Sequence, residues 1–463
     1  MEFFASLRKT AVSWAPAYRI LILLSICTIA ILSRVFSVIR YESIIHEFDP
    51  WFNFRATKIL VDKGWWDFKY WVDSESWFPL GRYSGHTLFP GLMMTAAAAH
   101  KALHWMLIPI DIRNVCVFLA PVFAAGTAMV SYLLAMEVTK RYEASMFCAL
   151  FMALIPSYIS RSVAGSYDNE AVAIFAVVLC FWTYVKAVNT GTMLHALISA
   201  LALYYMILAW GGYVFVLGIV AIFVLVVLIM GKFNIKVYVS YSIFYIIGSL
   251  LALCHPFVGI WQVWSSSEHL PSHAVFIIMQ FHYFSLFIKD HLSVEKFQFL
   301  QKNFIRVIAI VGAAGFIYLI VMGHTTWGHR ILTLINPVYA KKHNPLVASI
   351  SEHQSTSWGS FFFDFHFSLI FAPPGLYFLF AKRNSITHSK LFMAIYFTLS
   401  IYFSAIMIRL LLVSAPAAAI VAGCGVSYIV RVLVKGFKAN LTKDPTQKGK
   451  SIPLEMILMC LTL

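Results

Sequence analysis

Charged residues are scarce in this chain. Lys, Arg, Asp and Glu make up 12% of its 463 residues, whereas a soluble domain carries about a quarter. Hydrophobic residues reach 60% and the mean hydropathy is +0.79. This composition excludes an ordinary soluble domain and indicates a polytopic membrane protein, in which lipid takes the place of water around the helices.

Acidic residues are scarcer than basic residues. The chain has 35 Lys and Arg against 20 Asp and Glu, which gives a net charge of +15. In a soluble protein this excess would indicate nucleic-acid binding. Here the basic residues lie in short loops between apolar runs, where they fix the orientation of the spans. We therefore expect no nucleic acid among the partners.

Metal-binding cysteine patterns are also missing. All seven cysteines fall within apolar runs, and no pair has the spacing of a zinc site. They are typical of small core residues, so the sequence predicts neither a disulfide framework nor a zinc centre. The sequence also lacks an internal repeat of the kind on which many transporters are built.

Long apolar runs, in contrast, recur throughout the chain. A membrane span needs roughly 20 mostly apolar residues. The candidates lie at 20–38, 113–137, 143–160, 170–186, 193–209, 212–230, 237–255, 272–288, 304–322, 360–381, 391–407 and 410–430. The first run follows three basic residues and is too long for a cleaved signal peptide. It is therefore predicted to be a signal anchor with a cytosolic N-terminus.

A further run at 88–108 is interrupted by proline, lysine and two histidines. Counting it as a span would place Lys140 and Arg141 on the far side of the membrane and reverse every later loop. Leaving it out places the basic loops on the cytosolic side, in agreement with the positive-inside rule. The regions that then share the lumenal side are 39–112, 161–169 and 323–359.

The sequence therefore predicts an all-α polytopic membrane protein with about twelve complete transmembrane helices, a partial thirteenth and a large first lumenal loop. Its expected parts are a cytosolic N-terminus at 1–19, a transmembrane domain at 20–434 with lumenal loops at 39–112 and 323–359, a cytosolic linker at 435–450, and the start of a truncated final helix at 451–463.

Two acidic pairs fall on the predicted lumenal side. Glu47 and Asp49 follow the first span, and Asp168 and Glu170 begin a later one. Acids at the edge of a membrane bundle are costly and usually bind ions, protons or charged substrates. Pro50 predicts an extended backbone at Asp49. Capping of a helix N-terminus would also explain the second pair.

A third acid, Glu352, precedes the span that begins near residue 360. Arg161 lies just before the second acidic pair, and Arg409 lies between two closely spaced spans. Arginine in such a place either reaches to the interface or binds phosphate. Carboxylates from separate loops are ligands that Mg²⁺ or Mn²⁺ prefers, and such ions bridge proteins to phosphates. Together these residues predict a site for a membrane-embedded diphosphate.

Several segments of the chain resemble the catalytic subunit of eukaryotic oligosaccharyltransferase, the dolichyl-diphosphooligosaccharide–protein glycosyltransferase family. The resemblance runs from about residue 18 to about residue 435 and rests on His46–Asn53, Trp77–Arg82, Phe89–Met93, Ser160–Glu170 and Ser351–Gln354. The family has Val where this chain has Ile350, and both are β-branched. The resemblance implies the helical bundle of the C-type glycosyltransferases.

The resemblance also implies roles for the polar residues. Asp49, Glu352 and Arg161 would be catalytic, with the two carboxylates acting on the acceptor amide and Arg161 supporting the site. Arg409 and Glu47 would bind substrate, with Arg409 at the diphosphate.

The implied cofactor is Mn²⁺ or Mg²⁺, held by Asp49, Asp168 and Glu170. The implied reaction is inverting transfer of a preassembled oligosaccharide from dolichyl diphosphate to the asparagine amide of N-x-S/T sequons. The expected partners are the lipid-linked donor, acceptor polypeptides, membrane lipid and other oligosaccharyltransferase subunits. The expected location is the endoplasmic reticulum membrane, with a lumenal active site.

Three alternatives stay open at this point. Another polyprenyl-phosphate-sugar glycosyltransferase, such as a protein O-mannosyltransferase, also has an acidic pair in its first lumenal loop, but it lacks the second pair and the segment around Glu352. A non-catalytic donor-binding fragment is the second, because the family continues into a lumenal domain beyond the last span. A transporter is the third, although transporters bind their substrates near the bilayer midplane.

Overall fold

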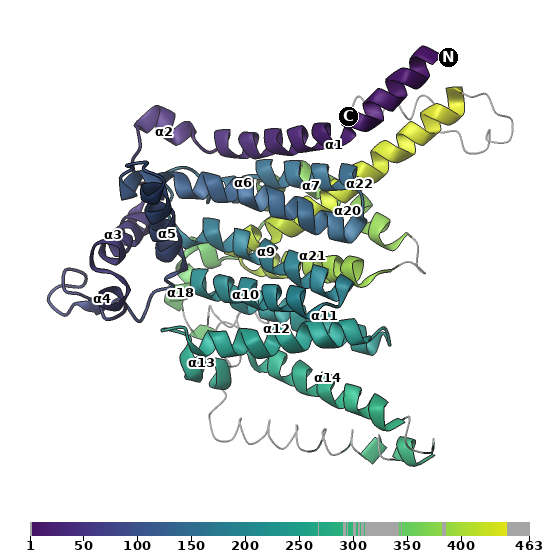
Figure 1. Cartoon of the computed structure of the whole chain (residues 1–463). Coiled ribbons are helices and arrows are strands. Elements are labelled where there is room, and N and C mark those ends of the chain that lie inside the picture. Colours follow the sequence, from purple (N-terminus) through teal and green to yellow (C-terminus); the bar gives the residue numbers. More distant parts are fainter. Residues whose placement is uncertain are drawn as a thin grey trace.

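The structure, a computed structural model, describes residues 2–266, 268–289, 293, 295–299, 302, 303, 306, 310, 342, 343, 345–381 and 386–441. In these ranges the regular structure is helical, apart from one antiparallel pair, β1 (Val72–Asp73) with β2 (Arg82–Tyr83). Long helices run side by side as one bundle (Figure 1). The predicted all-α polytopic fold is confirmed.

Seven helical segments of the described ranges are long and apolar enough to cross a membrane. They are Pro16–Tyr41, which includes the end of α1 (Glu2–Leu32) and α2 (Phe36–Tyr41), then α6 (Ile112–Thr139), α9 (Asn169–Thr190), α12 (Ile235–Leu253), α14 (Leu270–Lys289), α21 (His388–Ile406), and Ile408–Gly436, which joins η3 (Ile408–Leu410) to α22 (Leu411–Leu441). A bent pair, α19 (Trp358–Phe365) with α20 (Phe367–Phe380), would make an eighth. The shorter apolar helices are α7 (Tyr142–Leu154), α10 (Met193–Ala209) and α11 (Tyr213–Ile229).

The chain is thus a multi-pass membrane protein, while the total of about twelve spans stays a prediction. The predicted span at 304–322 and the final segment at 451–463 lie almost wholly outside the described residues.

Short helices gather at one end of the bundle, at the left of Figure 1. They are α3 (Phe48–Lys63), α4 (Trp65–Lys69), α5 (Gly91–Trp105), α13 (Gly259–Ser265) and α18 (Pro345–Ser349), and two further short elements are α8 (Pro156–Ile159) and η1 (Ser351–His353). As predicted, α5, which occupies the interrupted run, is not among the segments that could span a membrane. It packs closely on α10, because a Cβ added at Gly91 would lie 2.6 Å from the Ala209 nitrogen.

The predicted span at 360–381 is divided in two. α19 and α20 meet at 90°, and His366 between them has a left-handed φ of 46°. Phe361 and Phe365 bury the α19 part in a cluster with residues of α8 and α22. The run predicted as a span is therefore a bent pair of helices, with the bend at His366. Apolarity alone does not distinguish a helix that crosses lipid from one that turns to cover its neighbours.

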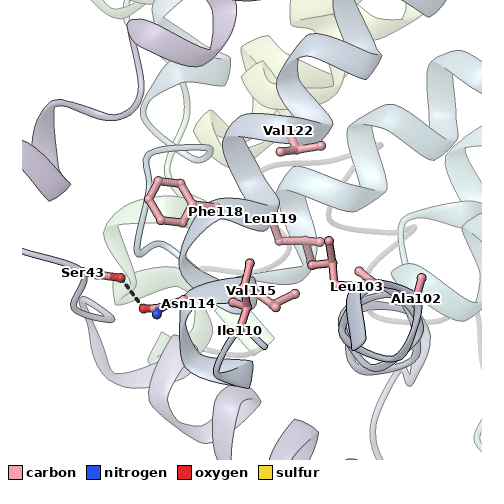
Figure 2. Close-up of a pocket in the computed structure, with 10 residues that line it drawn as sticks. Ser43, Ala102, Leu103, Ile110, Asn114, Val115, Phe118, Leu119 and Val122 are labelled. Atoms are coloured by element: carbon pink, nitrogen blue, oxygen red, sulfur yellow. Dashed lines mark hydrogen bonds between the residues drawn. The ribbon is translucent and has the colours of Figure 1, made fainter. Parts of the chain in front are cut away.

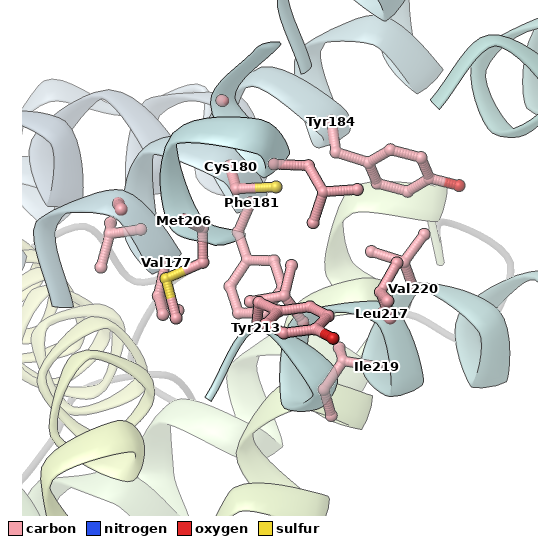
Figure 3. Packing of buried hydrophobic residues seen from close by; sticks show 14 of the residues in the cluster. Val177, Cys180, Phe181, Tyr184, Met206, Tyr213, Leu217, Ile219 and Val220 are labelled. Carbon is pink, nitrogen blue, oxygen red and sulfur yellow. The ribbon is translucent and has the colours of Figure 1, made fainter. Parts of the chain in front are cut away.

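α9 is the most buried of the spans, with 78% of its apolar window inside the protein. Figure 3 shows Phe181 and Tyr184 of α9 packed with Met206 of α10 and Tyr213 of α11. Dense packing on all sides leaves α9 little freedom to shift. Its first turn, which carries Glu170, is therefore held rigidly.

Two glycines allow α22 to approach its neighbours. A Cβ added at Gly375 of α20 would lie 1.9 Å from the Val421 carbonyl oxygen, and one added at Gly423 of α22 would lie 2.5 Å from the Cys148 nitrogen of α7. Small residues at such crossings let helix backbones pack closely within a membrane.

Gly423→Ala is expected to lower the thermal stability of the detergent-solubilised protein, because the new methyl group forces α7 and α22 apart. Overpacking of this kind costs about 1–3 kcal/mol. The control is Gly218→Ala on α11, where the added Cβ would meet no atom within 4 Å apart from its chain neighbours and the backbone of its own helix. Equal unfolding temperatures for the two variants would contradict the packing described here.

Candidate active site

Four of the predicted site residues form one ionic network. Oε1 of Glu170 accepts hydrogen bonds from Nε of Arg409 at 3.1 Å and from Nη2 at 2.9 Å. Oε2 of Glu170 lies 3.4 Å from Nε of Arg161. Glu352 pairs with Arg161 through Nη2 and lies 3.7 Å from Nη1 of Arg409. Each acid thus contacts both arginines.

The network joins parts of the chain that are far apart in sequence. Arg161 follows α8, Glu170 is in the first turn of α9, Glu352 is in η1 and Arg409 is in η3. The separations are 191 residues from Arg161 to Glu352 and 239 residues from Glu170 to Arg409. The structure therefore brings together residues that the sequence had grouped only by membrane side.

The network is buried on one side and open on the other. The side chain of Glu170 is 2% exposed, whereas those of Arg161, Arg409 and Glu352 are 35%, 36% and 37% exposed. The hydrogen bond from Arg161 lowers the pKa of Glu352, so this carboxylate stays ionised. An anion that arrives from the open side would meet two guanidinium groups already held in place.

Asp168 and Asp49 form a second acidic group beside the network. Asp168 caps α9, because its carboxylate accepts a hydrogen bond from the Asn169 nitrogen at 2.7 Å. Burial raises the pKa of Asp168, and the nearby charge of Asp49 raises it further. Asn53 of α3 donates to the Tyr167 carbonyl at 3.2 Å and reaches Asp168 at 3.5 Å. Capping and proximity to Asp49 therefore coexist at Asp168.

Asp49 differs from its prediction in backbone conformation. It lies in the first turn of α3, together with Pro50. Proline disfavours the α conformation in the residue before it, which is why the sequence predicted an extended segment. The first turn of a helix tolerates proline because its N–H groups have no partner inside the helix. The prediction of an extended backbone at Asp49 is wrong.

Glu47 stands apart from the network. It precedes α3, is exposed and has a left-handed φ of 69°. Among the described residues no ion pair joins it to the two arginines. Its predicted part in substrate binding stays a prediction.

The three predicted metal ligands are only partly gathered. Among the described residues, no three His, Cys, Asp or Glu side chains are grouped closely enough to hold a metal ion. Glu170 is paired with both arginines, yet its Oε2 and the buried Oδ1 of Asn169 lack hydrogen-bond partners. Together with Asp49 and Asp168, these oxygens are the hard donors that Mg²⁺ or Mn²⁺ prefers. The donor chemistry therefore fits such an ion.

Arg34 supports the site and was missed in the sequence. It is fully buried, and its Nε donates to Oγ of Ser162 at 2.7 Å while its Nη1 donates to the Ala153 carbonyl at 2.9 Å. Its own carbonyl accepts from the Ala164 nitrogen at 2.9 Å. Arg34 therefore ties α1 to the turn that carries Arg161. Its position near the end of the first apolar run was the sequence feature from which a structural role for Arg34 could have been predicted.

Arg34→Met is expected to lower the free energy of unfolding, because the Ser162 hydroxyl and the Ala153 carbonyl lose a buried donor. A buried group without its partner costs about 1–3 kcal/mol. Denaturant unfolding of the solubilised protein measures this, with Arg40→Met, an exposed arginine of the same segment, as the control. Equal stabilities would show that Arg34 does not hold the turn.

Comparisons with known proteins show which family this chain resembles. A family model described as "Oligosaccharyl transferase STT3, N-terminal" matches residues 17–422. Subunit STT3B of the dolichyl-diphosphooligosaccharide–protein glycosyltransferase of Arabidopsis thaliana is 44% identical over 96% of this chain and 60% of its own length. The STT3 subunit of Saccharomyces cerevisiae is 42% identical over 89% of this chain and 57% of its own length.

Solved structures show the same fold. The archaeal oligosaccharyltransferase AglB of Archaeoglobus fulgidus, in complex with an inhibitory peptide and a dolichol-phosphate, superposes with a TM-score of 0.73 at 15% identity. The match covers 93% of this chain and 52% of that one. This chain spans about 60% of the length of the curated relatives that it matches.

Proposed function

Because the chain belongs to the STT3 family of oligosaccharyl transferases, we propose that it transfers a preassembled oligosaccharide from a dolichyl diphosphate donor to the asparagine side chain of N-x-S/T sequons. The observation that carries this proposal is the network in which Arg161 and Arg409 share the buried Glu170 and open toward solvent at Glu352. Glu170 holds both guanidinium groups in place at the edge of the membrane bundle. There they can bind the phosphates of a diphosphate whose tail lies in lipid.

The donor would bind at the open side of the network. Arg409 is held by Glu170 through two hydrogen bonds but by Glu352 only at 3.7 Å. A diphosphate oxygen can therefore take the place of Glu352 on Arg409 while Glu170 keeps the guanidinium oriented. Charge-assisted bonds to phosphate are stronger than neutral ones, which favours this exchange.

The acceptor would be activated by carboxylates. An amide nitrogen is a poor nucleophile because its lone pair is delocalised into the carbonyl. Glu352, released from Arg409, and Asp49 would accept the two N–H groups of the asparagine amide and turn its lone pair toward the sugar. The new N–C1 bond then forms as the C1–O bond to the diphosphate breaks, with inversion at C1. The amide proton passes to a carboxylate.

A divalent ion would be held by Asp49 and Asp168, with Glu170 joining through its second oxygen. When bound, Mn²⁺ or Mg²⁺ would supply positive charge to the departing diphosphate. Asp168 is already fixed by its bond to the Asn169 nitrogen at 2.7 Å, so one ligand is oriented before any ion arrives. The identity of the ion belongs to this proposal.

The proposal also covers the location and the partners of the protein. The bundle would lie in the endoplasmic reticulum membrane, with the short helices and the active site on the lumenal side and the N-terminus in the cytosol. The donor, sequon-bearing polypeptides, membrane lipid and further oligosaccharyltransferase subunits would be its partners. The plant and yeast relatives, described as the STT3B and STT3 subunits of dolichyl-diphosphooligosaccharide–protein glycosyltransferase, support the proposed donor and the proposed partner subunits.

Glu352→Gln is expected to lower the rate of oligosaccharide transfer by about 100-fold, because a neutral amide neither pairs with Arg161 nor accepts strongly from the acceptor. Membranes from cells that carry the change are incubated with lipid-linked donor and a fluorescent sequon peptide, and the initial rate of glycopeptide formation is measured. Glu75→Gln is the control, since Glu75 is 77% exposed and pairs only with Arg55 in the described part of the chain. Equal rates for the two variants would contradict the proposed role of Glu352.

A further inference from the structure

One face of α3 contacts the residues that lead into α9. Asp49, Asn53 and Thr57 are spaced four residues apart on α3, so they lie on the same side of this helix. Asn53 is 7% exposed and Thr57 is fully buried. Nδ2 of Asn53 donates to the Tyr167 carbonyl at 3.2 Å, and Oγ1 of Thr57 lies 2.8 Å from the Tyr167 hydroxyl oxygen. The face that begins with Asp49 is therefore bonded to the residue that precedes Asp168.

The partner of Asn53 fixes the orientation of its amide group. A backbone carbonyl can only accept a hydrogen bond, so the NH₂ group of Asn53, and not its oxygen, faces Tyr167. The same nitrogen lies 3.5 Å from Oδ1 of Asp168, which its second N–H can reach. Asn53 thus contacts both the backbone before Asp168 and the carboxylate of Asp168.

Both donors to the Asp168 carboxylate contact the same oxygen. Oδ1 accepts from the Asn169 nitrogen at 2.7 Å, and Nδ2 of Asn53 lies on this oxygen as well. Among the described residues, no hydrogen bond reaches Oδ2 of Asp168. In metal sites the carboxylate ligands are themselves hydrogen-bonded by neighbouring groups that orient them. Oδ2 is therefore the oxygen of Asp168 that remains available to a cation.

The segment just before α3 is also held in place. Figure 2 shows Ser43 beside Asn114 of α6, and Oγ of Ser43 donates to Oδ1 of Asn114 at 2.8 Å. The His46 nitrogen donates to the carbonyl of Gly165 at 3.0 Å, and Gly165 has a left-handed φ of 92° that suits glycine. Asp49 thus follows a segment that is already bonded to the turn before α9.

We propose that Asn53 is a positioning residue for the divalent ion of the proposed function. Asn53 would turn Oδ1 of Asp168 toward α3, leave Oδ2 to the ion, and set the separation between Asp168 and Asp49, which lies one turn away on the same helix. Asn53 itself touches neither the ion nor the substrates. The inference rests on the proposed function, because it concerns the metal site of that function.

The test measures metal binding directly. The protein is purified in detergent, freed of divalent ions with a chelator that is then removed, and titrated with Mn²⁺, and electron paramagnetic resonance reports the free ion. The unaltered protein is expected to bind one Mn²⁺. Asn53→Leu and Asn53→Ser are expected to raise the Kd for Mn²⁺ by about tenfold or more, the usual loss when a hydrogen-bond partner of a metal ligand is removed. Leucine has no donor, and the serine hydroxyl is too short to reach Asp168.

Asn189→Leu is the matched control. Nδ2 of Asn189 also donates to a carboxylate, at 2.9 Å from Oε2 of Glu137, and Asn189 lies near the opposite end of α9 from Asp168. The control variant should lose thermal stability as Asn53→Leu does, yet keep the Kd of the unaltered protein. A change in affinity that the control does not share therefore cannot result from a weakened fold alone.

Two outcomes would overturn the inference, and they differ in what they say of the proposed function. Equal Kd values for Asn53→Leu, Asn189→Leu and an unaltered protein that binds Mn²⁺ would overturn the role of Asn53 and leave the proposed function intact. An unaltered protein that binds no Mn²⁺ would overturn the proposed metal site and the role of Asn53 with it.

Discussion

Asp49→Asn is expected to lower the rate of oligosaccharide transfer by about 10²–10³-fold, the usual loss when one electrostatic group at the reaction centre is removed. Asp49 lies in the first turn of α3, and its charge is close enough to raise the pKa of Asp168. Asparagine keeps the size of the side chain but removes the charge that would hold a divalent ion and accept from the acceptor amide. The initial rate of glycopeptide formation in membranes measures the effect.

The control for this prediction is Asp62→Asn. Asp62 is an exposed acid of the same helix, and no ion pair engages it within the described residues. The Asp62→Asn variant should transfer oligosaccharide at the rate of the unaltered protein. A near-normal rate for Asp49→Asn, with both variants present at equal levels in the membrane, would remove Asp49 from the active site.

Arg409→Lys is expected to cause a loss of similar size, about 100-fold in kcat/KM. Nε and Nη2 of Arg409 both donate to Oε1 of Glu170. The single ammonium group of lysine cannot reproduce this pair of hydrogen bonds. Without these two hydrogen bonds the cation is no longer fixed where the diphosphate would bind. The loss should therefore raise the KM for the lipid-linked donor and leave the KM for the peptide nearly unchanged.

Arg431→Lys is the matched control, since Arg431 lies on α22, the helix that follows η3, and contacts the ring of Phe378 and not the network. Kinetics at varied donor and fixed peptide concentration separate the two KM values. A normal donor KM for Arg409→Lys would show that Arg409 only neutralises Glu170 and has no part in donor binding.

The members of the ionic network could be singled out in the sequence because a charged group is costly at the edge of an apolar run. A carboxylate or guanidinium at the edge of an apolar run is unfavourable unless it binds something, so Glu170 and Arg409 stand out in the sequence. Their pairing could not be predicted in the same way. The two residues are separated by 239 positions, and only the packing of α9, α21 and α22 decides which arginine meets which acid.

Two features were hidden from the sequence for physical reasons. Arg34 falls inside the predicted span 20–38 and was given no role, yet it is fully buried and bonds the turn before α9. The bend at His366 depends on where Phe361 and Phe365 find space against α8 and α22, which hydropathy does not record. In both cases tertiary packing decides the outcome, while the local pattern is compatible with either one.

Transfer by the purified unaltered protein after removal of divalent ions tests the proposed reaction most directly. The donor is a dolichyl diphosphate oligosaccharide, the acceptor is an N-x-T peptide, and mass spectrometry follows the product. We expect no glycopeptide after chelation, restored product on addition of Mn²⁺ or Mg²⁺, and no product from the matched peptide with glutamine in place of asparagine. Transfer that proceeds equally well in the chelator, or donor binding without any product in the presence of metal, would contradict the proposed reaction.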